Sequence, residues 1–364
     1  MHKFSPLALQ NFVSEALKKE GASEYEASVV SEVTISADLM GIPSHGIRRL
    51  PRYLDAIKNG TIQLSTHPEL IADNQAISVF DAKGGFGQVV GNMAIEHSIT
   101  KAKTYGVSLV SIRNSNHFGI ASHYIRKALQ HNVIAFAFTN TSPLVVPFNG
   151  LQPLLGTNPI CIAIPTLFPP PFILDISTSV TSLGKIEDFL IKHQNVPEGW
   201  AIDGKGGTST DPTTLINNLK NKKSGGLLPL GGTTKKLGGH KGFGLGLVVE
   251  ILSAILAGSA FLDLVYPQNS DGSHKPANIG HLFGAIDISF FRPLDDFFAD
   301  MALFCKKIRC SKQTKKILLP GENEYLCEQK RILGGIPLSN DSLLMLGAIA
   351  TLYNLKFPDP ISKK

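Results

Sequence analysis

Cysteine and tryptophan are scarce in this chain of 364 residues, which contains four cysteines and one tryptophan. The cysteines fit neither a zinc-binding spacing nor a dense disulfide pattern, so we expect reduced thiols. No stretch has the character of a transmembrane helix, because the apolar run 242–261 contains Glu250 and four glycines. The first residues lack the apolar core of a signal peptide. We therefore expect a cytoplasmic protein with no membrane partner.

The chain also has only a small excess of positive charge. Its net charge is +6, and charged residues make up 18% of the sequence. The lysines are scattered, with neither a basic stripe among aromatic residues nor a basic helix long enough for a DNA groove. We therefore expect no nucleic-acid partner. The positive excess fits an anionic small molecule. The length is sufficient for about two domains, and the 43% of hydrophobic residues is ordinary globular composition.

The hydrophobic pattern divides the chain into a helical beginning and a mixed remainder. Apolar residues at helical spacing, with Gly after each segment, predict helices over 6–19, 23–39 and 45–59. β-branched runs between Gly- and Pro-rich turns predict strands at 76–80, 107–112, 133–139, 159–164, 172–175 and 280–287. Further helices are expected over 90–105, 245–257, 294–310 and 339–353, and a polar surface excursion at 197–225. The pattern indicates a mixed α and β fold.

A histidine lies where one of these strands gives way to a helix. His117 follows the strand 107–112 and three small polar residues, and it precedes Gly119 and a helical stretch at 120–130. Catalytic side chains collect at such junctions, because rigid elements hold them while the loop stays open to substrate. Histidine can take a hydroxyl proton and return it near neutral pH. The residues alone leave open a structural histidine that hydrogen-bonds the nearby backbone.

A second polar group, Ser44-His-Gly-Ile-Arg-Arg49, opens the third predicted helix. Arg49 and Tyr53 are four residues apart and would share one helix face, although Pro51 between them kinks or restarts the helix. The planar fork of an arginine matches the two oxygens of a carboxylate. The segment therefore either binds a small carboxylate or is a solvated basic helix start.

Two glycine-rich stretches are candidates for phosphate binding. The first, Gly85-Phe-Gly-Gln-Val-Val-Gly91, is one residue off the Rossmann fingerprint and lacks its acidic partner, so it is better interpreted as a strand-to-helix turn. The second, Gly238-Gly-His-Lys-Gly-Phe-Gly244, precedes an apolar helix, so backbone amides and Lys241 can hold an anion there. Asp175 ends a predicted strand, where its carboxylate either accepts hydrogen bonds from ribose hydroxyls or caps the following turn.

A set of short motifs, in order along nearly the whole chain, resembles the malate/L-lactate dehydrogenase family that includes ureidoglycolate dehydrogenase, sulfolactate dehydrogenase and diketogulonate reductase. The motifs are Ser44-His-Gly-Ile-Arg-Arg49 with Tyr53, Gly85-Phe-Gly-Gln88, Asn114-Ser-Asn-His-Phe-Gly119, Gly156-Thr-Asn-Pro159, Leu174-Asp-Ile-Ser-Thr-Ser179, Gly184-Lys-Ile186, Pro197-Glu-Gly-Trp200, Leu228-Pro-Leu-Gly-Gly232, Gly239-His-Lys-Gly-Phe-Gly244 and Pro320-Gly-Glu322. One departure is the segment 233–237, which lengthens the loop before the lysine motif relative to many bacterial members.

The resemblance implies an α+β fold in which a non-Rossmann sheet domain binds NAD or NADP beside a helical domain. Residues 1–70, joined by the C-terminal helices of 323–364, would form the helical substrate and dimer domain. Residues 71–322 would form the nucleotide-binding domain. Family members are typically homodimers whose active site lies near the interface, so we expect a homodimer.

The resemblance also implies roles for individual residues and no metal site. The expected catalytic residues are His117, His45 and Arg49. The expected substrate-binding residues are Ser44, Arg49 and Tyr53. The expected cofactor-binding residues are Thr141, Ser142, Asp175, Ile176, Ser177, Lys241, Pro320, Gly321 and Glu322.

The residues and the resemblance together predict hydride transfer between NAD(P) and the α-carbon of a small 2-hydroxy or 2-keto acid, with malate as the first substrate to expect. His117 or His45 would exchange the hydroxyl proton, and Arg49 would orient the carboxylate. Lactate, ureidoglycolate and sulfolactate are alternative substrates, and a non-catalytic nucleotide-binding protein is an alternative function. A metal hydrolase is disfavoured, because the sequence around His117 and His123 shows no zinc-ligand pattern.

Overall fold

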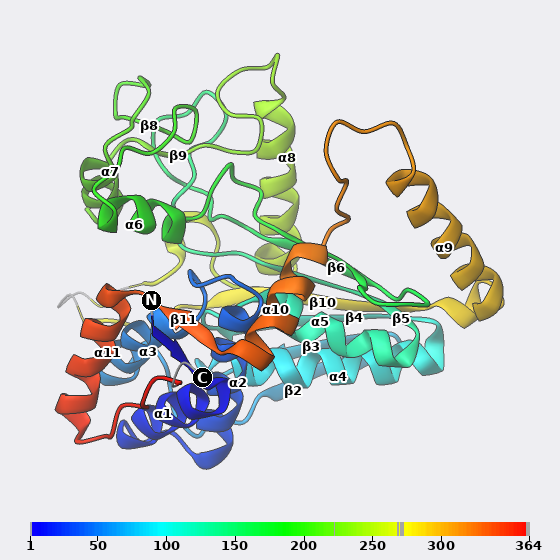
Figure 1. The fold of residues 1–364 in the computed structure, drawn as a ribbon, viewed down its shortest axis with the longest axis horizontal. Coiled ribbons are helices and arrows are strands. Elements are labelled where there is room, and N and C mark those ends of the chain that lie inside the picture. The colour runs from blue at the N-terminus through cyan, green and yellow to red at the C-terminus, as the bar shows by residue number, and fades with distance from the viewer. Residues whose placement is uncertain (1, 222, 268, 270–272, 362–364) are drawn as a thin grey trace.

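A seven-stranded mixed sheet lies at the centre of the computed structural model, which describes residues 2–221, 223–267, 269 and 273–361 (Figure 1). Its strands are β2 (Glu69–Asn74), β3 (Ile77–Asp81), β4 (Val107–Ser115), β5 (Val133–Thr139), β6 (Ile160–Ile164), β7 (Phe172–Ile176) and β10 (Ile279–Asp287). They follow the order β2-β3-β4-β10-β5-β6-β7, and every neighbouring pair except β3 with β4 is antiparallel. A Rossmann sheet is mostly parallel. The predicted non-Rossmann α+β class is therefore confirmed.

Helices cover both faces of this sheet. On one face, α4 (Gly87–Tyr105) packs against β4 and β10, and α5 (Ala121–Ile125) and the 3-10 helix η2 (Arg126–His131) pack against β5 and β6. On the other face lie α8 (Gly239–Glu250) and its π-helical continuation η3 (Ile251–Ile255). The central strand β10 is consequently buried along nearly its whole length. Gly284 in this strand allows the Phe136 ring of β5 to lie across it.

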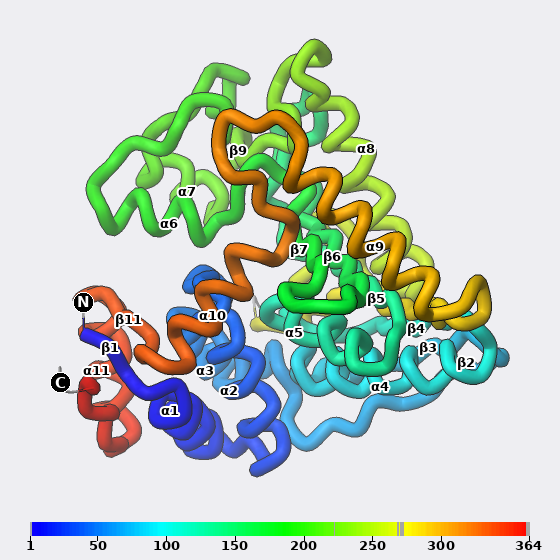
Figure 2. The backbone as a smooth tube through the Cα atoms, turned by 45° about the vertical axis from the view of Figure 1, so that its right-hand side comes forward, coloured from blue at the N-terminus to red at the C-terminus, as the bar shows by residue number. Residues whose placement is uncertain are grey.

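The first and last elements of the chain form a helical lobe together (Figure 2). Its members are α1 (Pro6–Lys19), α2 (Glu24–Leu39), α3 (Leu50–Lys58), α11 (Asn340–Tyr353) and a two-stranded sheet of β1 (His2–Phe4) with β11 (Ile336–Leu338). One hydrophobic cluster draws mainly on residues 4–62 and 336–357. Serine side chains cap α1, α2 and α11, as expected of helix starts. The proposed domain boundary at residues 70 and 71 stays a prediction.

The third predicted helix begins later than expected. A 3-10 turn, η1 (Ile47–Arg49), precedes α3, and Pro51 lies in the first turn of α3. Proline is tolerated there, because the first turn of a helix has no acceptor for its missing N–H. Pro51 therefore restarts the helix, which was one of the two expected outcomes.

The segment 197–225 is more ordered than a polar surface excursion. It contains α7 (Pro212–Lys220) and β8 (Ala201–Ile202), and β8 pairs with β9 (Gly226–Leu227). Asp211 caps α7 with both carboxylate oxygens. These elements share a hydrophobic cluster with α6 (Leu183–Ile191), so the segment has a small core of its own.

The remaining helices lie between η3 and β11 in the chain, on either side of β10. They are α9 (Leu294–Arg309), α10 (Glu322–Gly334) and two short 3-10 helices, η4 (Leu262–Leu264) and η5 (Ile288–Phe290). Only Cys305 of α9 is buried, and this helix extends along the outside of the molecule (Figure 2). None of the helices in the described part of the chain is both long and apolar enough to cross a membrane.

Candidate active site

The loop between β4 and α5 is held against the start of α4. The Asn116 amide donates hydrogen bonds to the carbonyl oxygens of Gly84 (2.7 Å) and Gly85 (3.0 Å). A Cβ atom at Gly87 would come within 2.2 Å of the Asn116 carbonyl oxygen, so only glycine permits this approach. Gly87 therefore meets protein backbone, as suits a strand-to-helix turn.

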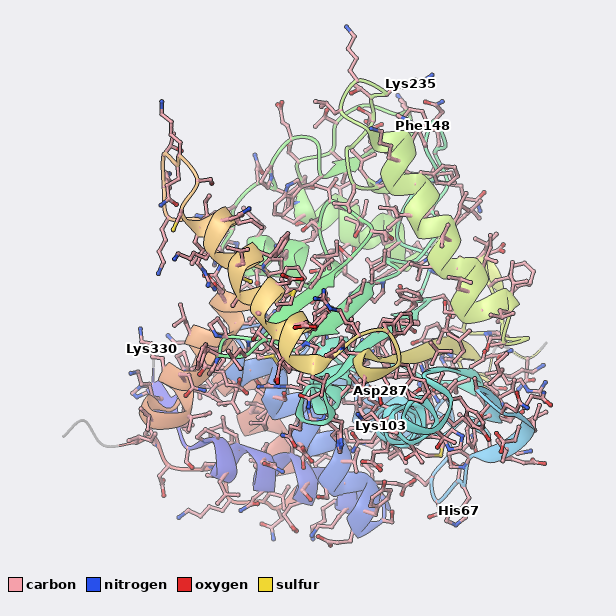
Figure 3. All side chains as sticks on the ribbon, turned by 90° about the vertical axis from the view of Figure 1, so that its right-hand side faces the viewer. His67, Lys103, Phe148, Lys235, Asp287 and Lys330 are labelled. Carbon is pink, nitrogen blue, oxygen red and sulfur yellow. The ribbon has the colours of Figure 1, made fainter. Side chains whose placement is uncertain are left out.

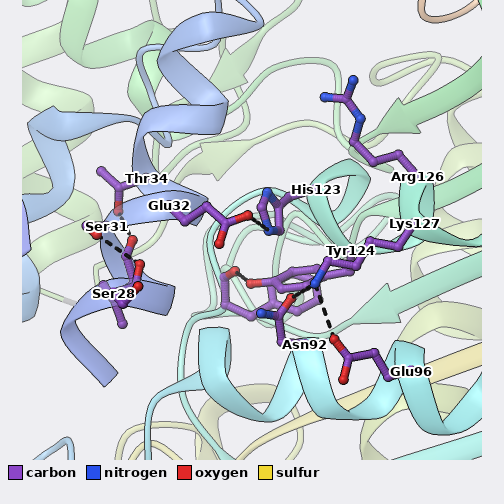
Figure 4. Close-up of polar contacts among 12 residues, drawn as sticks. Ser28, Ser31, Glu32, Thr34, Asn92, Glu96, His123, Tyr124, Arg126 and Lys127 are labelled. Atoms are coloured by element: carbon purple, nitrogen blue, oxygen red, sulfur yellow. Dashed lines mark hydrogen bonds and ion pairs between the residues drawn. The ribbon is translucent and has the colours of Figure 1, made fainter. Parts of the chain in front are cut away.

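The helical turns that follow this loop are fixed to α2 and α4 (Figure 4). Lys127 donates a hydrogen bond to Asn92 of α4 at 2.8 Å. His123 Nε2 lies 3.8 Å from the Glu32 carboxylate of α2, and burial lowers the pKa of His123 to about 3. His123 thus belongs to the framework that supports the loop. Within the described residues, no three His, Cys, Asp or Glu side chains are grouped so that they could hold a metal ion.

Two groups orient the ring of His117 through one nitrogen. The Tyr53 hydroxyl lies 3.0 Å from His117 Nδ1, and the Gly119 backbone N–H donates to the same nitrogen at 3.3 Å. No hydrogen bond within the described residues involves His117 Nε2, and the side chain is only partly buried. This nitrogen is therefore available to a substrate. Tyr53 is 1% exposed, and burial raises the pKa of its hydroxyl to about 12.

His45 stacks on His117, with ring centroids 5.7 Å apart and an angle of 16° between the ring planes. The Ser44 hydroxyl lies 3.0 Å from His45 Nδ1, which fixes this second ring in turn. Ser44 and His45 come from the segment before η1, Tyr53 from α3 and His117 from the loop after β4. Four of the residues predicted from the sequence therefore meet at one place.

Both histidines are electrically neutral near pH 7. Burial lowers the pKa of His45 to about 4, and the charges of Arg49 and Arg52 add to this effect. Burial also lowers the pKa of His117 well below its usual value, and Arg52 makes the largest contribution of any charged group. A neutral imidazole can accept a proton, whereas an imidazolium cannot. The site is thus ready to act as a base.

Arg49 lies beside these histidines, but its guanidinium already has protein partners. Its Nε donates to the Ser44 carbonyl oxygen, and its Nη2 lies 3.3 Å from a carboxylate oxygen of Glu187 in α6. The neighbouring Arg48 pairs with Asp188 of the same helix. Arg49 is therefore well placed to meet a substrate carboxylate, and it also ties the site to α6.

Three further residues of the site were missed by the sequence analysis. Arg52 donates to the Tyr266 hydroxyl at 2.6 Å, and the two residues are 214 positions apart in the chain. Gln88 of α4 is fully buried, yet its amide nitrogen and oxygen lack hydrogen-bond partners among the described residues. Its position in a motif of the resembled family was the available signal. Nothing local to Tyr266 marks it as a site residue.

Asp175, at the end of β7, lines a cavity of about 340 Å³ beside α5 and α10. One carboxylate oxygen accepts a hydrogen bond from the Ser122 backbone N–H at 2.9 Å, and burial raises the pKa of this carboxyl group. Ile176, Pro320 and Gly321 line the same cavity, which also has apolar walls from Met40 and Ile42, just after α2, and from β7. The cavity thus offers one oriented carboxylate and apolar surface, a combination that fits the ribose and base of a nucleotide.

The other predicted cofactor residues lie near the ends of β5 and β7. The Thr141 hydroxyl accepts a hydrogen bond from the Thr157 N–H at 3.0 Å, and Ser142 follows it in the chain. Ser177 donates to the Ser179 carbonyl oxygen at 3.0 Å. Glu322 does not line the cavity, and its carboxylate accepts a hydrogen bond from Arg309. Its carboxylate therefore has a protein partner outside the cavity, and its contact with the cofactor stays a prediction.

The glycines around Lys241 serve packing within the protein. Cβ atoms at Gly239 and Gly242 would come within 1.9 Å of the Gly232 carbonyl oxygen and 2.1 Å of the Leu230 carbonyl oxygen, respectively. Lys241 itself is exposed in the first turn of α8 and forms no ion pair within the described residues. The preceding loop 233–237 projects from the molecule at Lys235, near Phe148 (Figure 3). The structure thus leaves Lys241 free for an anion, although the lysine does not line the Asp175 cavity.

Several known proteins are similar to this chain in sequence and in structure. A family model described as malate/L-lactate dehydrogenase matches residues 4–346. The malate dehydrogenase of Pyrococcus abyssi is 40% identical over 96% of this chain and 94% of its own. The L-sulfolactate dehydrogenase of Methanocaldococcus jannaschii is 37% identical over 88% of this chain and 89% of its own. The crystal structure of malate dehydrogenase from Entamoeba histolytica superposes with a TM-score of 0.93, at 34% identity, over 98% of this chain and 99% of its own.

The match extends over the β4–α5 loop, the segment 44–53 and the sheet that carries Asp175, so it includes every part of the site described above. The chain belongs to the malate/L-lactate dehydrogenase family, and it is a hydroxyacid dehydrogenase that acts on a CH–OH group.

Proposed function

We propose that this enzyme transfers a hydride between NAD and the α-carbon of a small 2-hydroxy or 2-keto acid, and that malate is its principal substrate. The observation that carries the proposal is the free Nε2 of a neutral His117 beside His45, Tyr53 and Arg49. Relatives named malate dehydrogenase, at 39% and 40% identity, support malate as the first choice.

The proton chemistry follows from the orientation of His117. In the tautomer whose Nδ1 donates to the Tyr53 hydroxyl, and no longer accepts from the Gly119 N–H, Nε2 carries a lone pair that can accept the proton of the substrate hydroxyl. The bound nicotinamide supplies the acceptor for the hydride that leaves the same carbon. Arg49 is the expected partner of the carboxylate next to that carbon, and it holds the substrate in position.

The Asp175 cavity is the proposed site for the adenosine end of the cofactor. Its lining includes three acidic residues, Asp175, Glu324 and Glu328, and one cation, Arg126. Both outer nitrogens of Arg126 are held by Glu328 at 2.8 Å. A carboxylate suits the ribose hydroxyls of NAD, whereas the additional phosphate of NADP needs a free cation. The charge balance of the cavity therefore favours NAD over NADP.

Lys241 is the proposed partner of the cofactor's pyrophosphate. Calorimetric titration with NAD should show a weaker affinity for Lys241→Ala than for the unmodified enzyme, by about tenfold, the value of one charge-assisted hydrogen bond. Unchanged affinity would remove Lys241 from the site.

A homodimer is the proposed assembly, and the exposed apolar face of α8 supports it. Leu245, Val248, Ile251 and Ile255 follow helical spacing and are 43–52% exposed. A continuous apolar stripe of this kind marks a protein interface. Light scattering should show that Val248→Glu converts a dimer into a monomer.

We also place the enzyme in the cytoplasm, because all four cysteines are unpaired.

A spectrophotometric panel tests the function. Malate, lactate, sulfolactate and ureidoglycolate would each be offered with NAD and with NADP, and reduction of the cofactor would be followed. We expect the highest kcat/KM for malate with NAD. Cofactor binding without turnover of any of the four acids would instead favour a non-catalytic nucleotide-binding protein.

A further inference from the structure

Arg52 joins two distant parts of the chain at the edge of the candidate active site. It precedes Tyr53 in α3, and its Nη2 donates to the Tyr266 hydroxyl, 2.6 Å away. The guanidinium carbon also lies 5.9 Å from the centre of the Tyr266 ring. Tyr266 follows η4 in the segment that leads to β10. The Arg52 guanidinium is therefore held in place by the hydroxyl group and the ring of one tyrosine.

Arg52 differs from the two nearby arginines of the same segment in its lack of a carboxylate partner among the described residues. Arg48 pairs with Asp188, and Arg49 pairs with Glu187, so each has a carboxylate from α6. Within the described residues, Arg52 has no carboxylate within ion-pair distance. Both Arg52 and Tyr266 are only partly buried, so a small solute can reach them. A half-buried guanidinium without a counter-ion is a suitable binding site for an anion.

The unpaired charge also lies close to the reacting position. Among the charged groups, Arg52 has the largest effect on the pKa of His117, and it also affects His45. Its neighbour Tyr53 contacts His117 directly. A substrate that extends from His117 toward Arg52 would therefore bring an anionic group to this guanidinium.

We propose that Arg52, held by Tyr266, binds a second anionic group at the end of the substrate away from the reacting carbon, so that the enzyme selects 2-hydroxy diacids over 2-hydroxy monoacids. The inference rests on the proposed function and names its substrate class. Arg49 binds the carboxylate next to the reacting carbon. A monoacid such as lactate leaves Arg52 without a partner and loses one charge-assisted hydrogen bond.

The test compares Arg52→Leu with the unmodified enzyme on L-malate and L-lactate at saturating NAD. We expect kcat/KM for malate to fall about 10- to 100-fold more than kcat/KM for lactate, which is the value of a hydrogen bond to a charged group. Arg52→Lys keeps the charge and should recover part of the malate activity. Arg292→Leu, which removes a surface arginine paired with Asp300, is the matched control for net charge.

A binding measurement separates this inference from the proposed function. Calorimetry with succinate and butyrate, which cannot react, reports the second anionic group without any turnover. Arg52→Leu should abolish the preference of the enzyme for succinate over butyrate, even if no 2-hydroxy acid is oxidised. Equal losses for malate and lactate, or an unchanged succinate preference, would overturn the inference.

Discussion

In this site, neutral histidines lie beside positively charged arginines. His45 and His117 both have lowered pKa values, first through burial and then through the charges of neighbouring arginines. A substrate carboxylate near those arginines would offset part of that effect and raise the pKa of His117. Substrate binding would therefore make His117 a stronger base when the proton has to move.

The role of Arg49 is tested by a conservative substitution. Arg49 contacts the Ser44 carbonyl oxygen with one nitrogen and Glu187 with another, a geometry that the single ammonium of lysine cannot reproduce. We expect Arg49→Lys to lower kcat/KM for malate by about 10- to 100-fold, as expected for loss of a charged hydrogen bond, in steady-state kinetics. Nearly unchanged kcat/KM would move the carboxylate site away from Arg49. Lys58→Arg, on the surface of α3, is a suitable control.

Sequence and structure agree at the residue scale where signals are local. His117 was predicted from its place between a strand and a helix, and the 44–53 segment from its spacing and its motif. The structure brings these residues together, although their catalytic roles stay predictions. Arg52 and Tyr266 were missed, because their contact joins positions 214 residues apart and depends on the path of the whole chain.

At the scale of elements, α2 holds the segment that carries Ser44 and His45. The buried Asp38 carboxylate accepts a hydrogen bond from the Ile47 backbone N–H at 2.6 Å. Gly46 allows this contact, because a Cβ atom there would lie 2.1 Å from Asp38 Oδ1. A carboxylate of α2 thus sets the start of η1 and the position of the site residues around it.

Substitution of Gly46 tests this dependence. We expect Gly46→Ala to push the Asp38 carboxylate away, shift the 44–49 segment and lower kcat/KM by about 100-fold, as misplacement of reacting groups by about 1 Å does. Steady-state kinetics and cofactor titration would be measured together, and cofactor affinity should change little. Gly347→Ala in α11, where an added Cβ meets nothing within 4 Å, is the matched control. Equal kinetics for both variants would show that Asp38 does not position the segment.

The elements that the sequence predicted are those with strong local patterns. Ser23 and Glu26 form a capping box at the start of α2, and every second residue of β5 is fully buried. The pairing of β1 with β11 was not predicted, because each strand has three residues and gains its stability from the other end of the chain. β2 was also missed, since nearly all of its side chains are exposed and show no alternation.

At the scale of the whole molecule, several buried titratable groups make stability depend on pH. Burial lowers the pKa of His45 to about 4 and those of His123 and His281 to about 3. The unfolded chain therefore binds more protons than the folded one below about pH 6.5, the usual pKa of histidine, and stability is lost as the pH falls toward 4. Asp38 acts in the opposite sense between its usual value and about 7, because its carboxyl group is protonated in the fold.

The histidines outnumber the two carboxyl groups with raised pKa values, Asp38 and Asp175, so we expect the melting temperature to fall steadily from pH 6.5 to pH 4.5. Thermal unfolding followed by circular dichroism at constant ionic strength measures it. A melting temperature that stays level or rises over this range would contradict the burial of neutral histidines. The same series with Asp38→Asn, which removes one of the opposing groups, should show a steeper fall.

The most direct test of the central claim is the turnover number of His117→Ala with malate and NAD. A residue that accepts the hydroxyl proton contributes about 10²- to 10⁴-fold to the rate, so kcat should fall by that factor. The dissociation constant of NAD should stay unchanged, and the exposed His67→Ala should behave like the unmodified enzyme (Figure 3). A kcat for His117→Ala within a few-fold of the unmodified enzyme would contradict the assignment of His117 as the acid and base of this reaction.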